Sequence, residues 1–415
     1  MEPEGGLSPD NIVPEYLVDF HDFPREEYDL RWGRARKLMA EQELDGLMVT
    51  GDFCSAMNYR YFTGHLPRDY QQNHSRPHVF LLPLDGDPIL VSVSLSAPDA
   101  PRSTWIDDIR VYPEPFSFDI VRQAIADAGL AGGRIGAELG YDQRLMMPYL
   151  EFEGLRESLP QASFEDASSL LLRMRAVKSP REIDRIKQTA RIYSDAIETC
   201  FRTIEEGMTE EEVSQRLLHL IADGGAFRPP VYQNIICSTG GDWSLHFIPP
   251  VKKPLRRGDV IFVDAGCTYK GYWNEYNRMG TVGPADERAL ANHKVVREVV
   301  DGTVAAMRPG VPISEVLKAT VAAYRDQGVP AEKYKRYAEA PYAHIGHGVG
   351  LSGSEWPFLR MDAETPLEEG MYFSVEAYLW DGEKFGDEQT VIITGDGPDV
   401  ISTASRELYE VKTRG

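Results

Sequence analysis

The spacing of apolar and polar residues predicts an α/β arrangement for the first part of the chain. Residues 26–46 place apolar side chains at helical spacing and close on Gly46, and the apolar run 47–51 follows as a strand. Two more apolar runs, HVFLLPL and DPILVSVS, flank a glycine-containing turn and predict a hairpin. A helix over 117–129 and a strand at GRIGAEL continue the alternation, which indicates one compact domain.

A change of pattern near residue 175 marks a second domain. Ser179 is placed to cap a helix, with Pro180 at its first position and Glu182 at the capping-box position. A chain of 415 residues also exceeds the size at which one hydrophobic core keeps growing, so we expect domains at 1–175 and 176–415. The elements predicted for the second domain are helices to about 205 and over 209–223, strands at 231–238, 259–265 and 271–282, helices at 284–307 and 312–327, and a strand-rich end.

Composition excludes several classes of partner. The formal net charge of −21 disfavours nucleic acid and anionic membrane surfaces, because their phosphates would be repelled. No apolar run approaches the roughly 20 residues of a membrane span, and no secretory segment opens the chain. The scattered cysteines, without any CxxC pair, predict buried thiols of a reducing compartment. We therefore expect a cytoplasmic protein that binds neither nucleic acid nor membrane.

Candidate chemistry is concentrated in five potential metal ligands of the C-terminal half. Each lies in an apolar strand or turn phrase: VIFVDAG, GYWNEYN, IGHGVGL, MYFSVEAY or GDEQTVIIT. Carboxylates on apolar strands need a cation, because unpaired buried charges are costly. Several carboxylates with one imidazole suit Mn, Fe, Co or Zn, and indicate a hydrolytic or lyase metalloenzyme. The five residues are Asp264, Glu275, His347, Glu376 and Glu388.

Taken one at a time, these residues have structural alternatives. Asp264 follows an apolar strand and could cap the turn beside it. Glu275 lies on the next strand, where a hairpin could bring it beside Asp264 or leave it facing solvent. His347 stands among glycines that let the backbone pass close to a ligand, but it could also be a core residue. The prediction depends on the ordered set.

The ordered phrases resemble the pita-bread metallopeptidase superfamily, which includes methionine aminopeptidases, Xaa-Pro aminopeptidases, prolidases and the non-peptidase creatinases. The first 175 residues are similar in pattern to the creatinase/prolidase N-terminal domain, including the linker phrase RAVKSPREIDRIK. The resemblance covers nearly the whole chain. It implies a mixed α/β (α+β) fold with a creatinase-like N-terminal α/β domain and a C-terminal pita-bread domain.

The resemblance also implies roles for individual residues. The five candidate ligands would hold one or two divalent ions, and Glu376 would also accept and return a proton. His246 matches a histidine that faces the substrate in the family. A small molecule or dipeptide is the implied substrate, and a homodimer is the implied assembly. Residues 58–78 resemble a segment that closes the pocket of a neighbouring subunit, with a solvated loop as the alternative.

Three departures weaken the match to proline-peptide hydrolysis. Glu275 stands where aspartate is usual, which lengthens that ligand by one methylene. Ser354 stands where the peptidases carry a histidine that polarises the scissile carbonyl. Gly386 stands where they often place an arginine. The metal site itself is retained, because creatinases, which lack the metal, have no acidic residue at the position of Asp264.

Several functions therefore stay open at the level of sequence. The leading one is metal-dependent hydrolysis of an amide or C–N bond in a small substrate, with Xaa-Pro peptidase as the nearest description. A lyase acting on a small zwitterion such as dimethylsulfoniopropionate is an alternative, because Tyr342 matches a tyrosine of such lyases. A metal-free, creatinase-like C–N hydrolase and a non-catalytic binding protein with the same fold complete the set.

Overall fold

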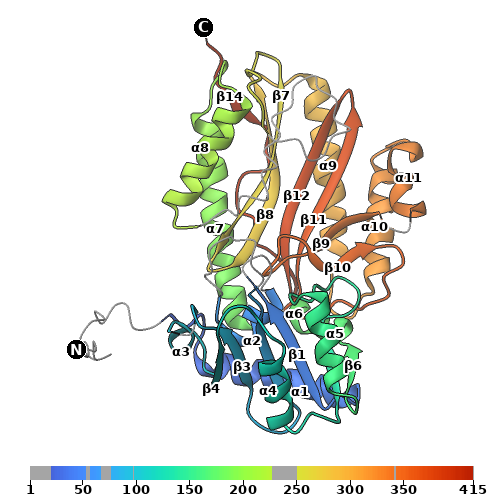
Figure 1. The fold of residues 1–415 in the computed structure, drawn as a ribbon. Helices are drawn as coiled ribbons and strands as arrows, with labels where there is room; N and C mark the ends of the chain where they lie inside the picture. Colours follow the sequence, from blue (N-terminus) through green and yellow to red (C-terminus); the bar gives the residue numbers. More distant parts are fainter. Residues whose placement is uncertain are drawn as a thin grey trace, which may run out of the picture. The chain divides into compact units, whose positions relative to one another are not determined.

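The chain forms two compact units, Met1–Arg175 and Ala176–Gly415 (Figure 1). The computed structural model describes residues 20–52, 57–66, 76–96, 98–226, 250–340 and 343–414. The predicted strand at 231–238 lies outside these residues.

The first unit contains a six-stranded mixed sheet in the order β4-β3-β2-β1-β5-β6. The predicted hairpin is confirmed, because β2 and β3 pair antiparallel, and β1 pairs antiparallel with β2 on one side and parallel with β5 on the other. The strands are β1 (Gly46–Gly51), β2 (His78–Pro83), β3 (Ile89–Val93), β4 (Asp108–Tyr112), β5 (Arg134–Ala137) and β6 (Ser163–Asp166).

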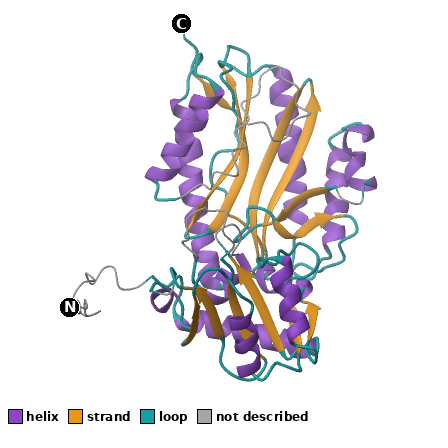
Figure 2. Ribbon diagram, viewed as in Figure 1, coloured by secondary structure: helices purple, strands orange, loops and turns teal. Residues whose placement is uncertain are grey.

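Helices cover both faces of this sheet, as the purple ribbons of Figure 2 show. Along β2, Val79 and Leu81 pack into a core shared with two of the helices, α4 and α5, whereas the Phe80 ring stacks on Phe62 of α2 with centroids 5.3 Å apart. This alternation explains why the whole strand is apolar and buried. The helices are α1 (Arg25–Glu41), α2 (Met57–Thr63), α3 (Ala100–Ser103), α4 (Asp119–Asp127), α5 (Tyr149–Ser158) and α6 (Ser168–Ala176).

The end of the first helix was predicted incorrectly. The sequence pattern closes this helix on Gly46, but α1 ends at Glu41 and Gly46 is the first residue of β1. Glu43 adopts a positive φ of 56°, which turns the chain out of the helix before the glycine is reached. The helices α2, α3, α5 and α6 were not predicted from the sequence.

The second unit has two sheets with long antiparallel hairpins at their centre. One sheet has the order β10-β9-β11-β12-β13 and the other the order β14-β8-β7. The strands are β7 (Val260–Tyr269), β8 (Tyr272–Val282), β9 (His344–Gly348), β10 (Glu355–Arg360), β11 (Tyr372–Asp381), β12 (Glu383–Thr394), β13 (Gly397–Val400) and β14 (Tyr409–Val411). The long strands β8 and β12 lie beside each other, which joins the two sheets (Figure 1).

Two groups of helices cover the outer faces of these sheets. The helix α7 packs against β7 and β8 and also contacts α8, and α9 packs against β11 and β12 (Figure 1). Both capping boxes are present, with Ser179 opening α7 and Thr209 opening α8, as the sequence predicts for Ser179. The helices are α7 (Pro180–Thr203), α8 (Glu210–Asp223), α9 (Glu287–Ala306), α10 (Ile313–Asp326) and α11 (Ala331–Glu339), of which α11 was not predicted.

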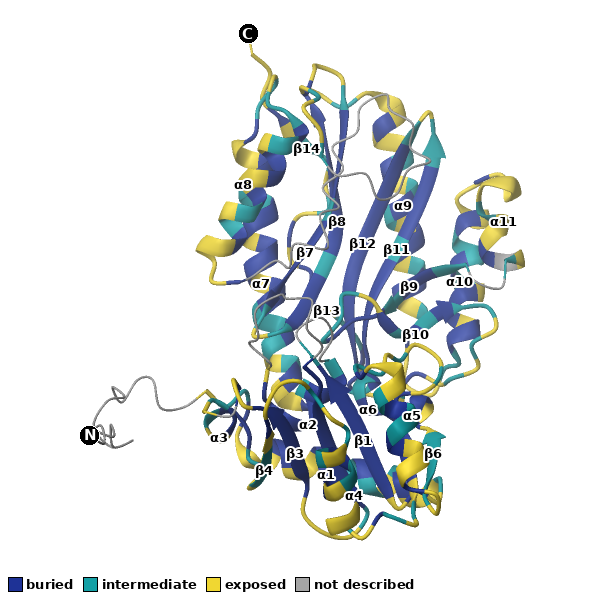
Figure 3. Cartoon of the chain, in the orientation of Figure 1, coloured by how far each residue is buried: buried dark blue, intermediate teal, exposed yellow. Residues whose placement is uncertain are grey.

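Alternate side chains of β7 point to opposite faces of the sheet. Ile261 and Val263 pack into the core formed with α7 and α8. Phe262 and Asp264 point to the opposite face, where Phe262 joins the core that includes β11 and β12. The strands of both sheets are mostly buried (Figure 3). A carboxylate on this inner face is therefore surrounded by protein.

Candidate metal centre

Five central strands of the second unit carry the five candidate ligands. Asp264 lies on β7, Glu275 on β8, His347 on β9, Glu376 on β11 and Glu388 on β12. Strand pairing brings three of them to the same level, because Glu376 is the register partner of Glu388 and His347 is the partner of Ser374, two residues before Glu376. The sequence order of the phrases thus becomes a set of neighbouring strands.

Three of the carboxylates converge. One oxygen atom each of Asp264, Glu275 and Glu388 lies within 4.8 Å of the others. The register partner of Glu275 is Gly266, so Glu275 lies diagonally across the hairpin from Asp264 on the same face. A Cβ atom at Gly266 would lie 2.4 Å from the Cβ of Glu275. Gly266, two residues after Asp264, therefore makes room for the side chain of Glu275.

His347 and Glu376 adjoin this group. His347 Nε2 lies 3.6 Å from Glu275 Oε1, and His347 Nδ1 lies 3.0 Å from the carbonyl oxygen of Gly348. Because a carbonyl only accepts, Nδ1 carries the hydrogen, which leaves Nε2 with its lone pair toward the carboxylates. Glu376 is half-buried, and its Oε2 accepts a hydrogen bond of 2.6 Å from the Tyr378 hydroxyl.

The electrostatics of the group show an excess of negative charge. Burial raises the pKa of Glu275 well above its ordinary value, and the charges of Asp264 and Glu376 raise it further. Burial also raises the pKa of Glu388, and the charges of Glu275, Asp264 and Glu376 raise it further. Among the described residues, Glu275 Oε1 has no hydrogen-bond partner. A divalent cation would remove this cost, so the donor set fits a metal centre.

Two polar residues that sequence reasoning missed hold Glu388 in place. The backbone N–H and the side-chain Nδ2 of Asn277 donate to Glu388 Oε2 at 2.9 and 2.8 Å, and Ser374 Oγ donates to Oε1. Both lie two residues from a candidate ligand on the same strand, Asn277 after Glu275 and Ser374 before Glu376. That spacing, which puts them on the ligand-bearing face, was the available signal.

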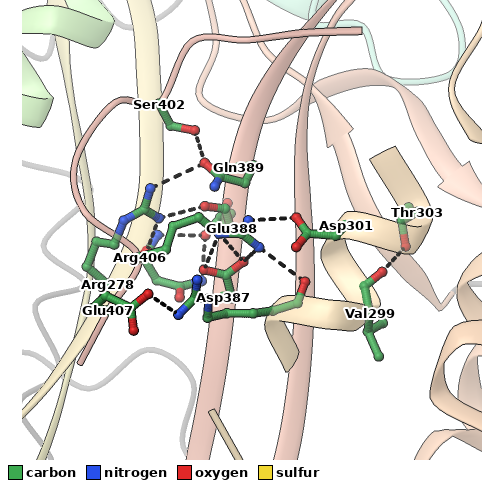
Figure 4. Close-up of polar contacts among 12 residues, drawn as sticks. Arg278, Val299, Asp301, Thr303, Asp387, Glu388, Gln389, Ser402, Arg406 and Glu407 are labelled. Atoms are coloured by element: carbon green, nitrogen blue, oxygen red, sulfur yellow. Dashed lines mark hydrogen bonds and ion pairs between the residues drawn. The ribbon is translucent and has the colours of Figure 1, made fainter. Parts of the chain in front are cut away.

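Two arginines anchor the strand around Glu388 (Figure 4). Arg278 donates to the carbonyl oxygen of Glu388 at 2.7 Å and to Gln389 Oε1 at 3.3 Å. Arg406 forms ion pairs of 2.6 Å with Asp387 and with Asp301 of α9. Because the residues on either side of Glu388 are tied down, its backbone has little freedom to move.

The structure also places the residues at which the sequence departs from the peptidases. Ser354 is exposed, and the adjacent Glu355 is buried and forms an ion pair with Lys178 at 3.1 Å. This lysine also donates to the carbonyl oxygen of Ala176 at 3.3 Å. Glu355 is thus paired with a lysine, whereas the carboxylates of Asp264, Glu275 and Glu388 lie close to one another. Two predicted site residues, His246 and Tyr342, lie outside the described residues, as do 67–75 of the segment 58–78.

Comparison with known proteins identifies the family. Residues 184–395 match metallopeptidase family M24, and residues 31–177 match the creatinase/prolidase N-terminal domain. An Xaa-Pro dipeptidase from Pyrococcus furiosus is 28% identical over 266 residues, which are 63% of this chain and 73% of the relative. An ectoine hydrolase from Halomonas elongata is 24% identical over 413 residues, which are 93% of this chain and 98% of the relative.

The fold is shared with solved structures. An Xaa-Pro dipeptidase from Bacillus anthracis superposes with a TM-score of 0.77 at 23% identity, covering 93% of this chain and 99% of that chain. This likeness confirms the predicted fold. Within the described residues, no helix is both long and apolar enough to cross a membrane. The chain belongs to metallopeptidase family M24 and carries the creatinase/prolidase N-terminal domain of that family.

Proposed function

We propose that this protein is a metal-dependent hydrolase that cleaves the amide bond of Xaa-Pro dipeptides. The observation that carries the proposal is the cluster of Asp264, Glu275 and Glu388: one oxygen of each lies within 4.8 Å of the others, and burial and mutual repulsion raise the pKa of Glu275 and Glu388. Membership of a metallopeptidase family supports the reaction class. The names of the Pyrococcus furiosus and Bacillus anthracis relatives support the dipeptide substrate.

The five candidate ligands would hold one or two divalent ions, with Mn, Fe, Co and Zn as the chemically suited metals. Bound there, such ions lower the pKa of a water molecule and polarise the substrate carbonyl. Asp264 and Glu275 would contribute from β7 and β8, and His347 would contribute through Nε2. Asn277 and Ser374 would keep both oxygens of Glu388 oriented.

Glu376 is our candidate for proton transfer. It is half-buried, and the Tyr378 hydroxyl fixes one of its two oxygens. Glu376 would take a proton from the attacking water and return it to the leaving nitrogen. His246 stays our sequence-based candidate for contact with the substrate, and Tyr342 for the lyase alternative.

A second substrate class is favoured by a specific observation. The ectoine hydrolase relative aligns with 93% of this chain, the same share as the Bacillus anthracis dipeptidase. Hydrolysis of a C–N bond in a small non-peptide substrate uses the same centre and the same proton transfer. A cytoplasmic homodimer completes the proposal, and sedimentation of the purified protein tests the dimer.

The deciding experiment strips the purified chain of metal, restores single metals and measures turnover. Xaa-Pro dipeptides, matched Xaa-Ala dipeptides and ectoine are compared as substrates. Metal-restorable cleavage that prefers proline supports the dipeptidase, and metal-restorable turnover of ectoine alone supports the second class. Equal turnover before and after stripping would contradict both, because it would point to metal-free, creatinase-like chemistry.

A further inference from the structure

The inner face of the β11–β12 hairpin is organised in successive layers. Glu376 pairs with Glu388, then Tyr378 pairs with Gly386, and then Trp380 pairs with Lys384. Alternate residues of a strand point to the same face, and paired residues share that face. The hairpin therefore carries a carboxylate layer, a tyrosine–glycine layer and a tryptophan–lysine layer in order.

The lysine reaches into the middle layer. Its Nζ lies 4.0 Å from the centroid of the Tyr378 ring and 4.1 Å from the centroid of the Phe262 ring. A Cβ atom at Gly386 would lie 2.8 and 2.7 Å from these same two side chains. Because residue 386 is glycine, no side chain at this position displaces the Tyr378 and Phe262 rings, and the Lys384 ammonium lies over the faces of both rings. A positive charge thus stands directly beside the carboxylate layer.

A second cation approaches the outer layer. The Arg336 guanidinium of α11 lies 5.1 Å from the centroid of the Trp380 ring, and Lys384 Nζ lies 5.9 Å from the same centroid. Arg336 is exposed, Trp380 is half-buried and Lys384 is 2% exposed. The two cations therefore lie at different depths, with Arg336 at the surface and Lys384 in the interior.

The charges of these groups favour an anion between them. Burial lowers the pKa of Lys384, while the carboxylates of the acidic centre act in the opposite direction and Arg336 lowers it again. Arg336 donates to the Tyr337 hydroxyl at 2.6 Å and forms no ion pair with a described residue. The carboxylates of the acidic centre act on Lys384, and an anion between Lys384 and Arg336 would attract both cations and offset their mutual repulsion.

We propose that Lys384 and Arg336 form a subsite for a carboxylate group of the substrate, with Trp380 as its wall. This inference rests on the proposed function, because a dipeptide carries a carboxylate close to its scissile bond. The amide carbonyl then lies toward Glu376 and Glu388, and the carboxylate lies toward Lys384. The subsite would give the enzyme a preference for free acids over their amides.

The first test compares an Xaa-Pro dipeptide with its C-terminal amide. We expect the Lys384→Met variant to lose about 10- to 100-fold in kcat/KM on the free acid, mainly through KM, with little change on the amide. Lys384→Arg should retain most of the preference for the acid, and Arg336→Gln should lose part of it. Lys318→Met, which removes an exposed lysine of α10, is the control.

The second test measures binding without turnover. Calorimetry of the metal-loaded full chain with proline and with prolinamide should show that Lys384→Met weakens the acid about tenfold and leaves the amide unchanged. Equal weakening of both ligands, or of neither, would overturn the subsite and leave Lys384 as a counter-charge to the carboxylates. If Lys384→Met does not fold, Lys384→Arg and Arg336→Gln decide by the same comparison.

The two proposals fail in different ways. If the wild-type protein cleaves no dipeptide but binds small carboxylates through Lys384, the dipeptidase function is wrong and the subsite stands. If it cleaves the dipeptide acid and amide equally well, the subsite is wrong and the dipeptidase function stands.

Discussion

Burial raises the pKa of the buried Glu138 in the first unit and of the half-buried Glu275 in the second, but the surroundings of the two carboxyl groups differ. Glu138 of the first unit accepts hydrogen bonds from the backbone N–H and hydroxyl of Thr50 at 2.7 and 2.8 Å, and from Asn58 Nδ2 at 2.7 Å. Glu275 of the second unit faces other carboxylates, and its Oε1 has no hydrogen-bond partner among the described residues. Burial alone therefore does not identify a metal ligand.

The pKa shifts separate the two cases. Burial raises the pKa of Glu138 to about 7, and the hydrogen bonds from Asn58 and Thr50 and the charge of Arg175 act to lower it. For Glu275, burial and then the charges of Asp264 and Glu376 raise the pKa well above its ordinary value, although hydrogen bonds with Ser374 and Glu388 act to lower it. Hydrogen-bond donors surround the carboxyl group of Glu138, whereas other carboxylates surround that of Glu275, and a divalent cation would offset their repulsion.

The largest expected effect is loss of the centre itself. Asp264→Asn removes one negative charge from the cluster, and we expect metal-dependent turnover to fall by about 10³-fold or more. Asp362→Asn is the matched control, because Asp362 is exposed and paired with Arg360. Retention of turnover in Asp264→Asn, measured at saturating metal, would contradict the assignment of this carboxylate.

The buried carboxylate of Glu355 is paired with a lysine, so its surroundings differ from those of both Glu138 and Glu275. Glu355 and Lys178 form a buried pair, and Lys178→Met leaves the carboxylate without its partner. We expect the free energy of unfolding to fall by about 3–5 kcal/mol, measured by denaturant titration. Lys318→Met breaks the exposed pair with Glu315 and should reduce the free energy of unfolding far less. Similar losses in both variants would show that burial of the pair is unimportant.

The pH dependence of stability should report Glu138. Its pKa is about 7 in the folded chain against an ordinary value of 4.5, so the folded state holds the proton more tightly. The stabilisation is complete below pH 4.5 and is lost as the pH rises through about 7, by up to about 3 kcal/mol. We expect wild type to lose stability relative to Glu138→Gln between pH 5 and pH 8. A constant difference across this range would remove Glu138 as the titrating group.

The smallest expected effect concerns the residues that orient Glu388. Asn277→Ala removes one side-chain donor to Glu388 Oε2 and should weaken metal affinity about 10- to 100-fold, measured by competition with a chelator. Asn292→Ala removes a comparable bond, to Asp381 from α9, and should leave the affinity unchanged. Unaltered affinity in Asn277→Ala would mean that the backbone N–H and Ser374 suffice.

The sequence predicted the fold and the ligand-bearing strands because both leave local signals. Apolar runs and the capping box of Ser179 set the elements, and carboxylates such as Asp264 interrupt apolar phrases. The convergence of the side chains is a matter of register, and a shift of one residue would turn Glu275 to the opposite face. Register could be inferred from the family resemblance, but not from the residues of one strand.

Other features could not be read from the chain alone. The ammonium of Lys384 lies over two aromatic rings that belong to different strands, and no local sequence pattern predicts such a contact. The role of Asn277 likewise depends on a contact with a strand more than a hundred residues later. The predicted end of α1 at Gly46 was wrong because Glu43 takes up the left-handed turn that the pattern assigned to a glycine.

Metal binding by the purified chain is the most direct test of the difference between the two glutamates. Equilibrium dialysis followed by elemental analysis would compare wild type, Glu275→Gln and Glu138→Gln. A metal centre built on the converging carboxylates predicts one or two equivalents of a divalent metal in wild type and in Glu138→Gln, and a clear loss in Glu275→Gln. Equal metal content in all three proteins, or none in wild type, would contradict it.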